Sequence, residues 1–311
     1  KEAWASAKPA FDALVASTTF ANLESQQSER QKVVAAGKAL LSGLSETDYV
    51  AAMPEEGKGA PQWFRLSRPA PTGAESDAQE LGYRGVRFWR GRLSDVGASV
   101  TSENANAEGY LVEIVARLIQ PLGAGEKGYT LIDTKATYFL SLDREDEAWH
   151  VSTSLRDSRL SKGRVLTETG ARHGRSLSVQ ISESGQKTIS LAPTVPPEGY
   201  LSQVESHLLP RLLIKSGVAG EAPMDFGFYA YRSDSQSVSL RRDRVARDPS
   251  QANAWTITTT FREGEPPQTS VFRDDADLVR TRLSDDRTWT PTTLEALMKL
   301  WEAKGLPTKG P

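Results

Sequence analysis

A long series of strand-like segments separated by short polar turns is the feature that most constrains the fold of this chain. Residues 128–142, for example, are rich in the β-branched and aromatic residues that fit a pleated sheet. The polar stretches 143–146, 183–186 and 233–236 each separate two such segments and are typical of hairpin connections. Hairpins join strands that run antiparallel. The sequence therefore predicts a large, mainly antiparallel sheet.

A repeated tetrapeptide, Glu-Gly-Tyr-Leu, occurs at residues 108–111 and again at 198–201. Apolar residues follow each copy at three- and four-residue steps, which is the spacing of one buried helix face. The first segment, 110–122, also fits a two-residue alternation, whereas the second, 200–213, fits only the helical spacing. We interpret the pair as an ancestral duplication in which each copy begins an amphipathic helix. Tyr110 and Tyr200 are then expected at equivalent places.

Helical patterns also mark both ends of the chain. Ser45 and Asp48 resemble a capping pattern inside the apolar-periodic stretch 2–53, and Thr292 with Glu295 forms a capping box before a final helix. These patterns predict an α+β protein with an N-terminal helical segment, a duplicated, mainly antiparallel β-sheet with one amphipathic helix per repeat, and a C-terminal helix. The expected divisions are a helical segment at 1–54, a linker at 55–79, a first β-rich repeat at 80–167, a second at 168–250, and closing strands with the C-terminal helix at 251–311.

Composition excludes several function classes. The 38 basic and 40 acidic residues give a net charge of -2, so no overall field attracts the protein to nucleic acid or to an anionic membrane. The chain has no cysteine, which removes disulfides, thiolate nucleophiles and cysteine-ligated metals. No run of apolar residues is long enough to span a membrane. A signal peptide or anchor preceding Lys1 would be compatible with this sequence.

No motif identifies a catalytic, metal or cofactor site. The histidines are His150, His173 and His207, and no pair of them has metal-ligand spacing. Residues 123–128 match the letters of a dinucleotide-binding glycine motif. They are expected to follow a helix and to precede a strand, whereas phosphate binding needs a strand before the motif and a helix N-terminus after it. We expect a turn there. The sequence predicts no cofactor, no metal and no catalytic residue.

Two sets of residues are candidates for ligand binding. Aromatic residues of the predicted strands could line an apolar groove or simply fill the core between sheet and helix; they are Tyr138, Trp149, Phe228, Tyr229 and Tyr231. A local basic cluster, Arg172, His173 and Arg175, could hold an anion or could be solvated turn residues.

The alternative class is a hydrolase that uses carboxylates with a histidine. Asp133, Asp143 or Asp146 with His150 would be the acid–base pair, and this hypothesis requires the side chains to converge in one pocket. A hairpin with charged, solvated turn residues also accounts for these acidic residues near His150.

Residues 80–290 are expected to form strands, then a helix that begins with Glu-Gly-Tyr-Leu, then further strands. This layout resembles the curved sheets of periplasmic lipoprotein-carrier-like proteins. That resemblance implies an envelope or secreted, non-enzymatic binding or scaffold protein, with an apolar, lipid-like ligand or a protein partner. It implies a periplasmic, secreted or membrane-anchored location, although a cytoplasmic one also fits the composition. It assigns no functional residue.

Overall fold

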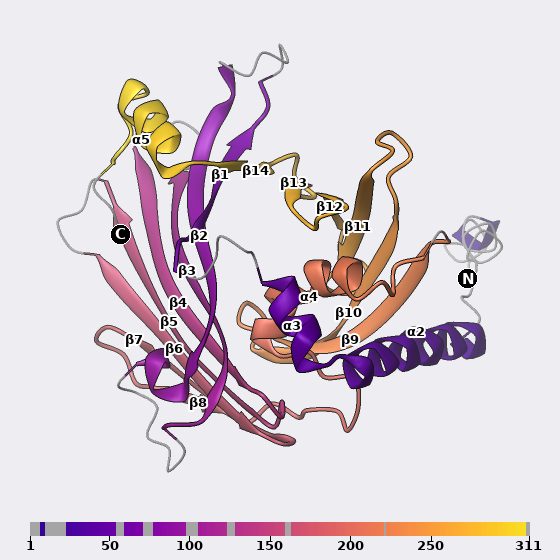
Figure 1. Ribbon diagram of the computed structural model, residues 1–311. Coiled ribbons are helices and arrows are strands. Elements are labelled where there is room, and N and C mark those ends of the chain that lie inside the picture. Colours follow the sequence, from indigo (N-terminus) through magenta and orange to yellow (C-terminus); the bar gives the residue numbers. More distant parts are fainter. Residues whose placement is uncertain are drawn as a thin grey trace.

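The computed structural model describes residues 7–9, 23–53, 59–70, 77–97, 105–122, 128–158, 163–220 and 222–308. Within these residues, one antiparallel sheet of 14 strands curves around helix α4 (Figure 1). The described residues include the α-helices α2 (Leu23–Gly43), α3 (Glu46–Ala52), α4 (Gln203–Lys215) and α5 (Leu294–Ala303), and the short 3-10 helix η3 (Leu93–Val96). The strands are β1 (Gln62–Arg68), β2 (Gln79–Arg92), β3 (Glu108–Pro121), β4 (Tyr129–Ser141), β5 (Asp146–Asp157), β6 (Arg164–His173), β7 (Ser176–Glu183), β8 (Ile189–Leu191), β9 (Met224–Arg232), β10 (Ser237–Arg247), β11 (Ala254–Thr260), β12 (Gln268–Arg273), β13 (Leu278–Arg282) and β14 (Thr288–Thr292).

The order of the strands divides the sheet into two wings. One wing runs from β1 to β8 and the other from β14 back to β9, and β1 pairs antiparallel with β14 where the wings meet. Strands β8 and β9 therefore form the two edges of the sheet, although they are neighbours in sequence. The chain passes from one edge to the other through α4. A bridge between Tyr200 and Tyr229 attaches the start of this crossing to β9.

Helix α4 lies between the two wings because it is apolar on two sides. Its N-terminus is fixed by a capping box, in which the Ser202 hydroxyl accepts from the Glu205 N–H at 3.1 Å and the Glu205 carboxylate accepts from the Ser202 N–H at 2.9 Å. Leu208 and Leu212 are fully buried against residues of β2 and β3. Leu209 and Leu213 are fully buried against residues of β9 to β12. The helix is thus the shared core of both wings.

The other helices cover other parts of the sheet. Helix α3 packs beside α4, and its Tyr49 donates to Glu205 at 2.5 Å. Helix α2 lies along β9, where Gly227 allows close contact with Val33. Helix α5 buries Trp301 against the face of β2 that carries Tyr83, with ring centroids 4.8 Å apart.

The α+β class, the antiparallel sheet, the N-terminal helical segment and the C-terminal helix are confirmed. The helix expected over 110–122 is wrong, because these residues form β3, which pairs along its length with β2 and β4. Its valines and isoleucines fit both spacings, and the two adjacent strands settle the choice in favour of the sheet. The arrangement with one helix per repeat is therefore wrong as well. Tyr110 stacks on Tyr49 at 4.7 Å, whereas Tyr200 begins the crossing to α4, so the two tyrosines are not equivalent.

Smaller expectations have mixed outcomes. The linker predicted at 55–79 contains β1, whose Phe64 is buried. The C-terminal helix begins one residue later than expected, with Thr293 as its N-cap. Residues 10–22 of the N-terminal segment and residues 123–127 of the glycine motif lie outside the described residues. The remaining divisions of the chain stay a prediction.

Candidate functional site

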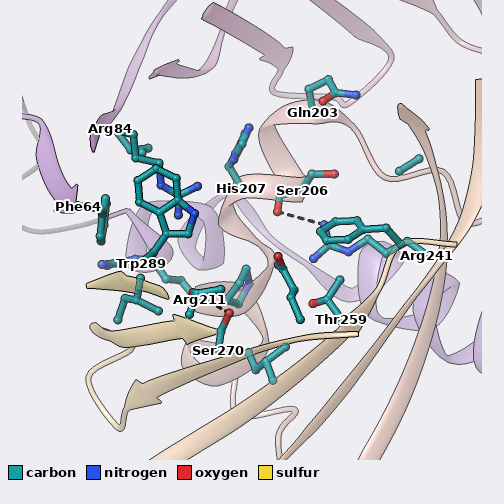
Figure 2. Close-up of a pocket in the computed structure, with 18 of the residues that line it drawn as sticks. Phe64, Arg84, Gln203, Ser206, His207, Arg211, Arg241, Thr259, Ser270 and Trp289 are labelled. Atoms are coloured by element: carbon teal, nitrogen blue, oxygen red, sulfur yellow. Dashed lines mark hydrogen bonds between the residues drawn. The ribbon is translucent and has the colours of Figure 1, made fainter. Parts of the chain in front are cut away.

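A cavity of about 460 Å³ lies between α4 and the inner face of the curved sheet. We call it the central cavity. Its volume is within the range of about 300–1,000 Å³ that is usual for small-molecule sites. Its walls come from β1, β2, α4 and β9 to β14, and Figure 2 shows many of the lining side chains. Most of the apolar lining consists of aromatic and branched side chains, among them Phe64, Val86, Phe88, Ile257, Phe272 and Trp289.

Four arginines also line the central cavity, and three of them have acidic partners. Arg241 makes a bidentate ion pair with Asp243, at 2.7 and 2.9 Å. Arg211 donates to Asp277 at 3.2 Å. Arg232 pairs with Asp234 and with Glu265. The charges of these three side chains are therefore compensated by the protein itself.

Arg84 is the fourth arginine. It belongs to β2, where alternate residues face the cavity, and it shares that face with Val86 and Phe88. Its guanidinium lies 4.5 Å from the ring centroid of Trp289 and 5.3 Å from that of Phe64. These two aromatic rings, from β14 and β1, hold the guanidinium in a fixed position.

Among the described residues, Arg84 has no hydrogen-bond acceptor and no carboxylate partner, and its Nε is buried and unsatisfied. Burial lowers the pKa of Arg84 from 12.5 to about 10, and no neighbouring anion opposes this effect. The side chain is still protonated at neutral pH. Among the described residues that line the cavity, Arg84 is therefore the one arginine without an anionic partner, and the rings beside it are apolar.

His207 projects from α4 into the same cavity and lies near two of the arginines. Burial, followed by the positive charges of Arg84 and Arg241, lowers the pKa of His207 to about 3. Its ring lies 5.4 Å from the ring of Tyr138. At neutral pH the imidazole is uncharged and can both donate and accept a hydrogen bond. Figure 2 shows His207 between Arg84 and Arg241.

Of the aromatic residues predicted to line an apolar groove, Tyr231 lines the central cavity. Trp149 contacts Tyr231, with ring centroids 5.3 Å apart, and Tyr138 contacts His207. The other two lie elsewhere. Phe228 is packed in the core beneath α2, and Tyr229 faces Arg30 of that helix.

The predicted anion cluster is divided between the two faces of β6. Arg172 is buried, pairs with Glu147 at 3.1 Å and stacks on Tyr200 at 5.0 Å. His173 is exposed and contacts Asp146 at 2.7 Å, and this carboxylate raises the pKa of the imidazole. Arg175 is exposed in the turn that follows. Adjacent strand residues point to opposite faces, so the three side chains do not form one site.

The structure does not bring the predicted hydrolase residues together. Asp133 is buried in an ion-pair group with Arg117 and Arg156. Asp143 lies in the turn after β4, and Asp146 pairs with His173 rather than with His150. None of these carboxylates lines the central cavity.

No group of three or more metal-ligating side chains occurs in the described ranges. Of the helices that the structure describes, none combines the length and the apolar character needed to cross a bilayer.

Comparison with protein families and with curated proteins gives no match for this sequence. Among solved structures, a β-barrel-like protein of the domain of unknown function DUF1849 from Brucella abortus is similar, with a TM-score of 0.45 and 14% sequence identity. The match covers 75% of this chain and 95% of that chain.

Sequence reasoning missed Arg84, although a signal was present. In the segment Arg84-Gly85-Val86-Arg87-Phe88, alternation places one arginine with the valine and the phenylalanine and the other on the opposite face. Many arginines on a strand are usually solvated. The position of Arg84 on the apolar face was the exception that could have been recognised.

Proposed function

We propose that this protein is a non-enzymatic binding protein that holds an apolar, lipid-like small molecule in the central cavity. The observation that carries the proposal is the cavity itself, which lies inside the curve of the sheet and combines polar side chains with a larger apolar surface formed by residues such as Phe88, Ile257 and Trp289. The curved antiparallel sheet around a helix is also the layout that the resemblance to lipoprotein-carrier-like proteins implies. The separation of Asp133, Asp143 and Asp146 argues against the hydrolase alternative.

The proposal can be tested with an uncharged fluorescent reporter, N-phenyl-1-naphthylamine, whose emission rises in an apolar site. We expect saturable binding to the purified protein and displacement by a long-chain alcohol. Ser206 lines the cavity from α4, and Ser206→Phe should fill part of the space and weaken reporter binding. Ser178, which is exposed on β7, provides the control variant Ser178→Phe, which should bind as the parent does.

Equal reporter binding by the parent and by Ser206→Phe would place the reporter outside the cavity and count against the proposal. Absence of saturable binding by the folded parent protein would count against it more directly.

The proposal includes the predicted location in the cell envelope or outside the cell. Fractionation of cells that express the natural gene should recover the protein with envelope or medium markers. Recovery with cytoplasmic markers alone would contradict this part.

A further inference from the structure

We infer that the ligand of the central cavity carries an acidic head group, a carboxylate or a phosphate, that Arg84 binds. This inference rests on the proposed function, because it assigns a chemical class to the molecule held in the same cavity. The ligand is then a single-chain anionic amphiphile, whose head group meets the guanidinium while its chain contacts the aromatic wall.

The arginines of the cavity differ in whether the protein supplies an acidic partner. Arg211, Arg232 and Arg241 each have a carboxylate partner in the protein, whereas Arg84 has none among the described residues. A buried charge without a partner is destabilising. An arginine that is enclosed by apolar side chains and faces an open cavity is a site that an anion from outside the chain can complete.

The position of the Arg84 guanidinium suits the binding of an anion. The guanidinium carbon of Arg84 lies over the rings of Trp289 and Phe64, and the N–H groups of Arg84 have no acceptor among the described residues. Those N–H groups suit a carboxylate or a phosphate, because planar guanidinium binds either anion through two parallel hydrogen bonds. The rings also limit the motion of the side chain, which reduces the entropy lost on binding.

The groups around Arg84 also favour an anion. His207 from α4 faces the same space and is close enough to Arg84 for the positive charge to affect its ionisation. As a neutral imidazole it can donate a second hydrogen bond to an oxygen of the head group. No carboxylate of the cavity wall competes for Arg84, because Asp234 is paired with Arg232. The local field therefore favours an anion.

Apolar side chains next to Arg84 can contact the alkyl chain of the ligand. Val86 and Phe88 continue from Arg84 along β2, and Ile257 and Phe272 line the cavity from the opposite wing. An alkyl chain placed there would be in contact with apolar side chains and would leave water, which favours binding. Charge at one end and apolar wall along the remainder are the features of an amphiphile site.

The experiment compares three ligands of equal chain length: dodecanoate, dodecyl phosphate and dodecan-1-ol. Each displaces N-phenyl-1-naphthylamine from the parent protein, from Arg84→Met and from Arg87→Met. Arg87 lies on the same strand but outside the cavity, where it pairs with Glu113 at 2.7 Å and stacks on Trp89. Arg87→Met thus removes the same charge from the same strand without changing the site.

We expect at least one of the anions to bind the parent about ten- to a hundred-fold more tightly than the alcohol, as loss of a hydrogen bond to a charged group implies. Arg84→Met should bind the anions and the alcohol with similar affinity. Arg87→Met should behave as the parent does. The stronger of the two anions shows whether the head group is a carboxylate or a phosphate.

Three results would overturn the inference, and they differ in what they say of the proposed function. If the alcohol binds the parent as tightly as both anions, or if Arg84→Met keeps the preference for anions, the head-group assignment fails while the apolar site stands. If the reporter and all three ligands fail to bind the folded parent, the proposed function fails together with the inference. The shift of the melting temperature of the parent with each ligand provides the same comparison without any variant.

Discussion

Arg84→Met is expected to stabilise the ligand-free protein, although it removes two aromatic contacts. Lowering the Arg84 pKa from 12.5 to about 10 corresponds to a folding penalty of about 3 kcal/mol for the charged form, at about 1.4 kcal/mol for each pH unit. The pKa is lower in the folded state, so the penalty is complete below pH 10 and is relieved only as the pH rises from about 10 towards 12.5. At neutral pH the variant escapes all of it.

The contacts of the guanidinium with Trp289 and Phe64 offset part of this gain. Each cation–π contact contributes roughly 0.5–1 kcal/mol, and methionine retains much of the packing of the arginine stem. The expected net effect is a rise of about 1–2 kcal/mol in the free energy of unfolding. Urea denaturation at pH 7, followed by tryptophan fluorescence on protein freed of lipid, measures it.

Arg241→Met is the matched control and should change stability in the opposite direction. It leaves Asp243, which is 1% exposed, without its ion-pair partner, and an uncompensated buried charge costs about 3–5 kcal/mol. If Arg84→Met destabilised the protein as much as Arg241→Met does, the reasoning would be refuted, because Arg84 would then have a compensating interaction inside the protein.

Three further predictions concern pH, backbone packing and helix capping. His207 has a pKa of about 3 in the folded protein against 6.5 for a free imidazole. The free energy of unfolding should therefore fall as the pH drops from about 6.5 towards 3, at up to about 1.4 kcal/mol per pH unit. Between pH 7 and pH 4 the urea midpoint of His207→Phe should fall less than that of the parent. Gly109→Ala should destabilise the protein by at least roughly 1–3 kcal/mol, because the new Cβ would lie 2.1 Å from the Leu140 carbonyl oxygen. Gly199→Ala should cost roughly 1–2 kcal/mol, because Gly199 has a φ of 70°. Thermal melts of both variants measure the two losses of stability. Ser202→Ala removes the N-cap of α4 and should cost about 0.5–2 kcal/mol in urea denaturation.

Each of these has an outcome that would contradict it. An unchanged pH dependence for His207→Phe would mean that another group causes the acid sensitivity. A wild-type melting temperature for Gly109→Ala would mean that the two strands can separate at that point without cost. For the Ser202 variant, Ser202→Thr should keep most of the stability, and an equal loss in both variants would exclude the loss of the cap as the cause.

The sequence allowed the local elements to be predicted where turn and strand signals agreed. The hairpins around residues 143–146, 183–186 and 233–236 were correct because a polar turn and flanking β-branched residues specify the same structure. The segment 110–122 was wrong because its apolar residues satisfy two periodicities, and only its pairing with β2 and β4 decides between them. That pairing is not visible in a local window.

The site was harder to predict than the fold, for a related reason. The central cavity combines residues of β1, β2, α4 and β9 to β14, and no local pattern shows that these segments meet. Of the five aromatic residues proposed for an apolar groove, Tyr231 lines the cavity and Trp149 contacts it, whereas Phe228 and Tyr229 belong to the contact with α2. Arg84 was recognisable only by its position among apolar residues on one face of a strand.

The pairing of β1 with β14 also determines when the site can form. These strands come from opposite ends of the described sheet sequence, so their contact closes the largest loop in the fold and depends on residues that are synthesised late. Arg84 and Phe64 are synthesised early, but Trp289 reaches the guanidinium only when β14 joins β1. A nascent or truncated chain that ends before β14 therefore has the arginine without one of its two aromatic faces, and the anion site that we infer stays incomplete until β14 is in place.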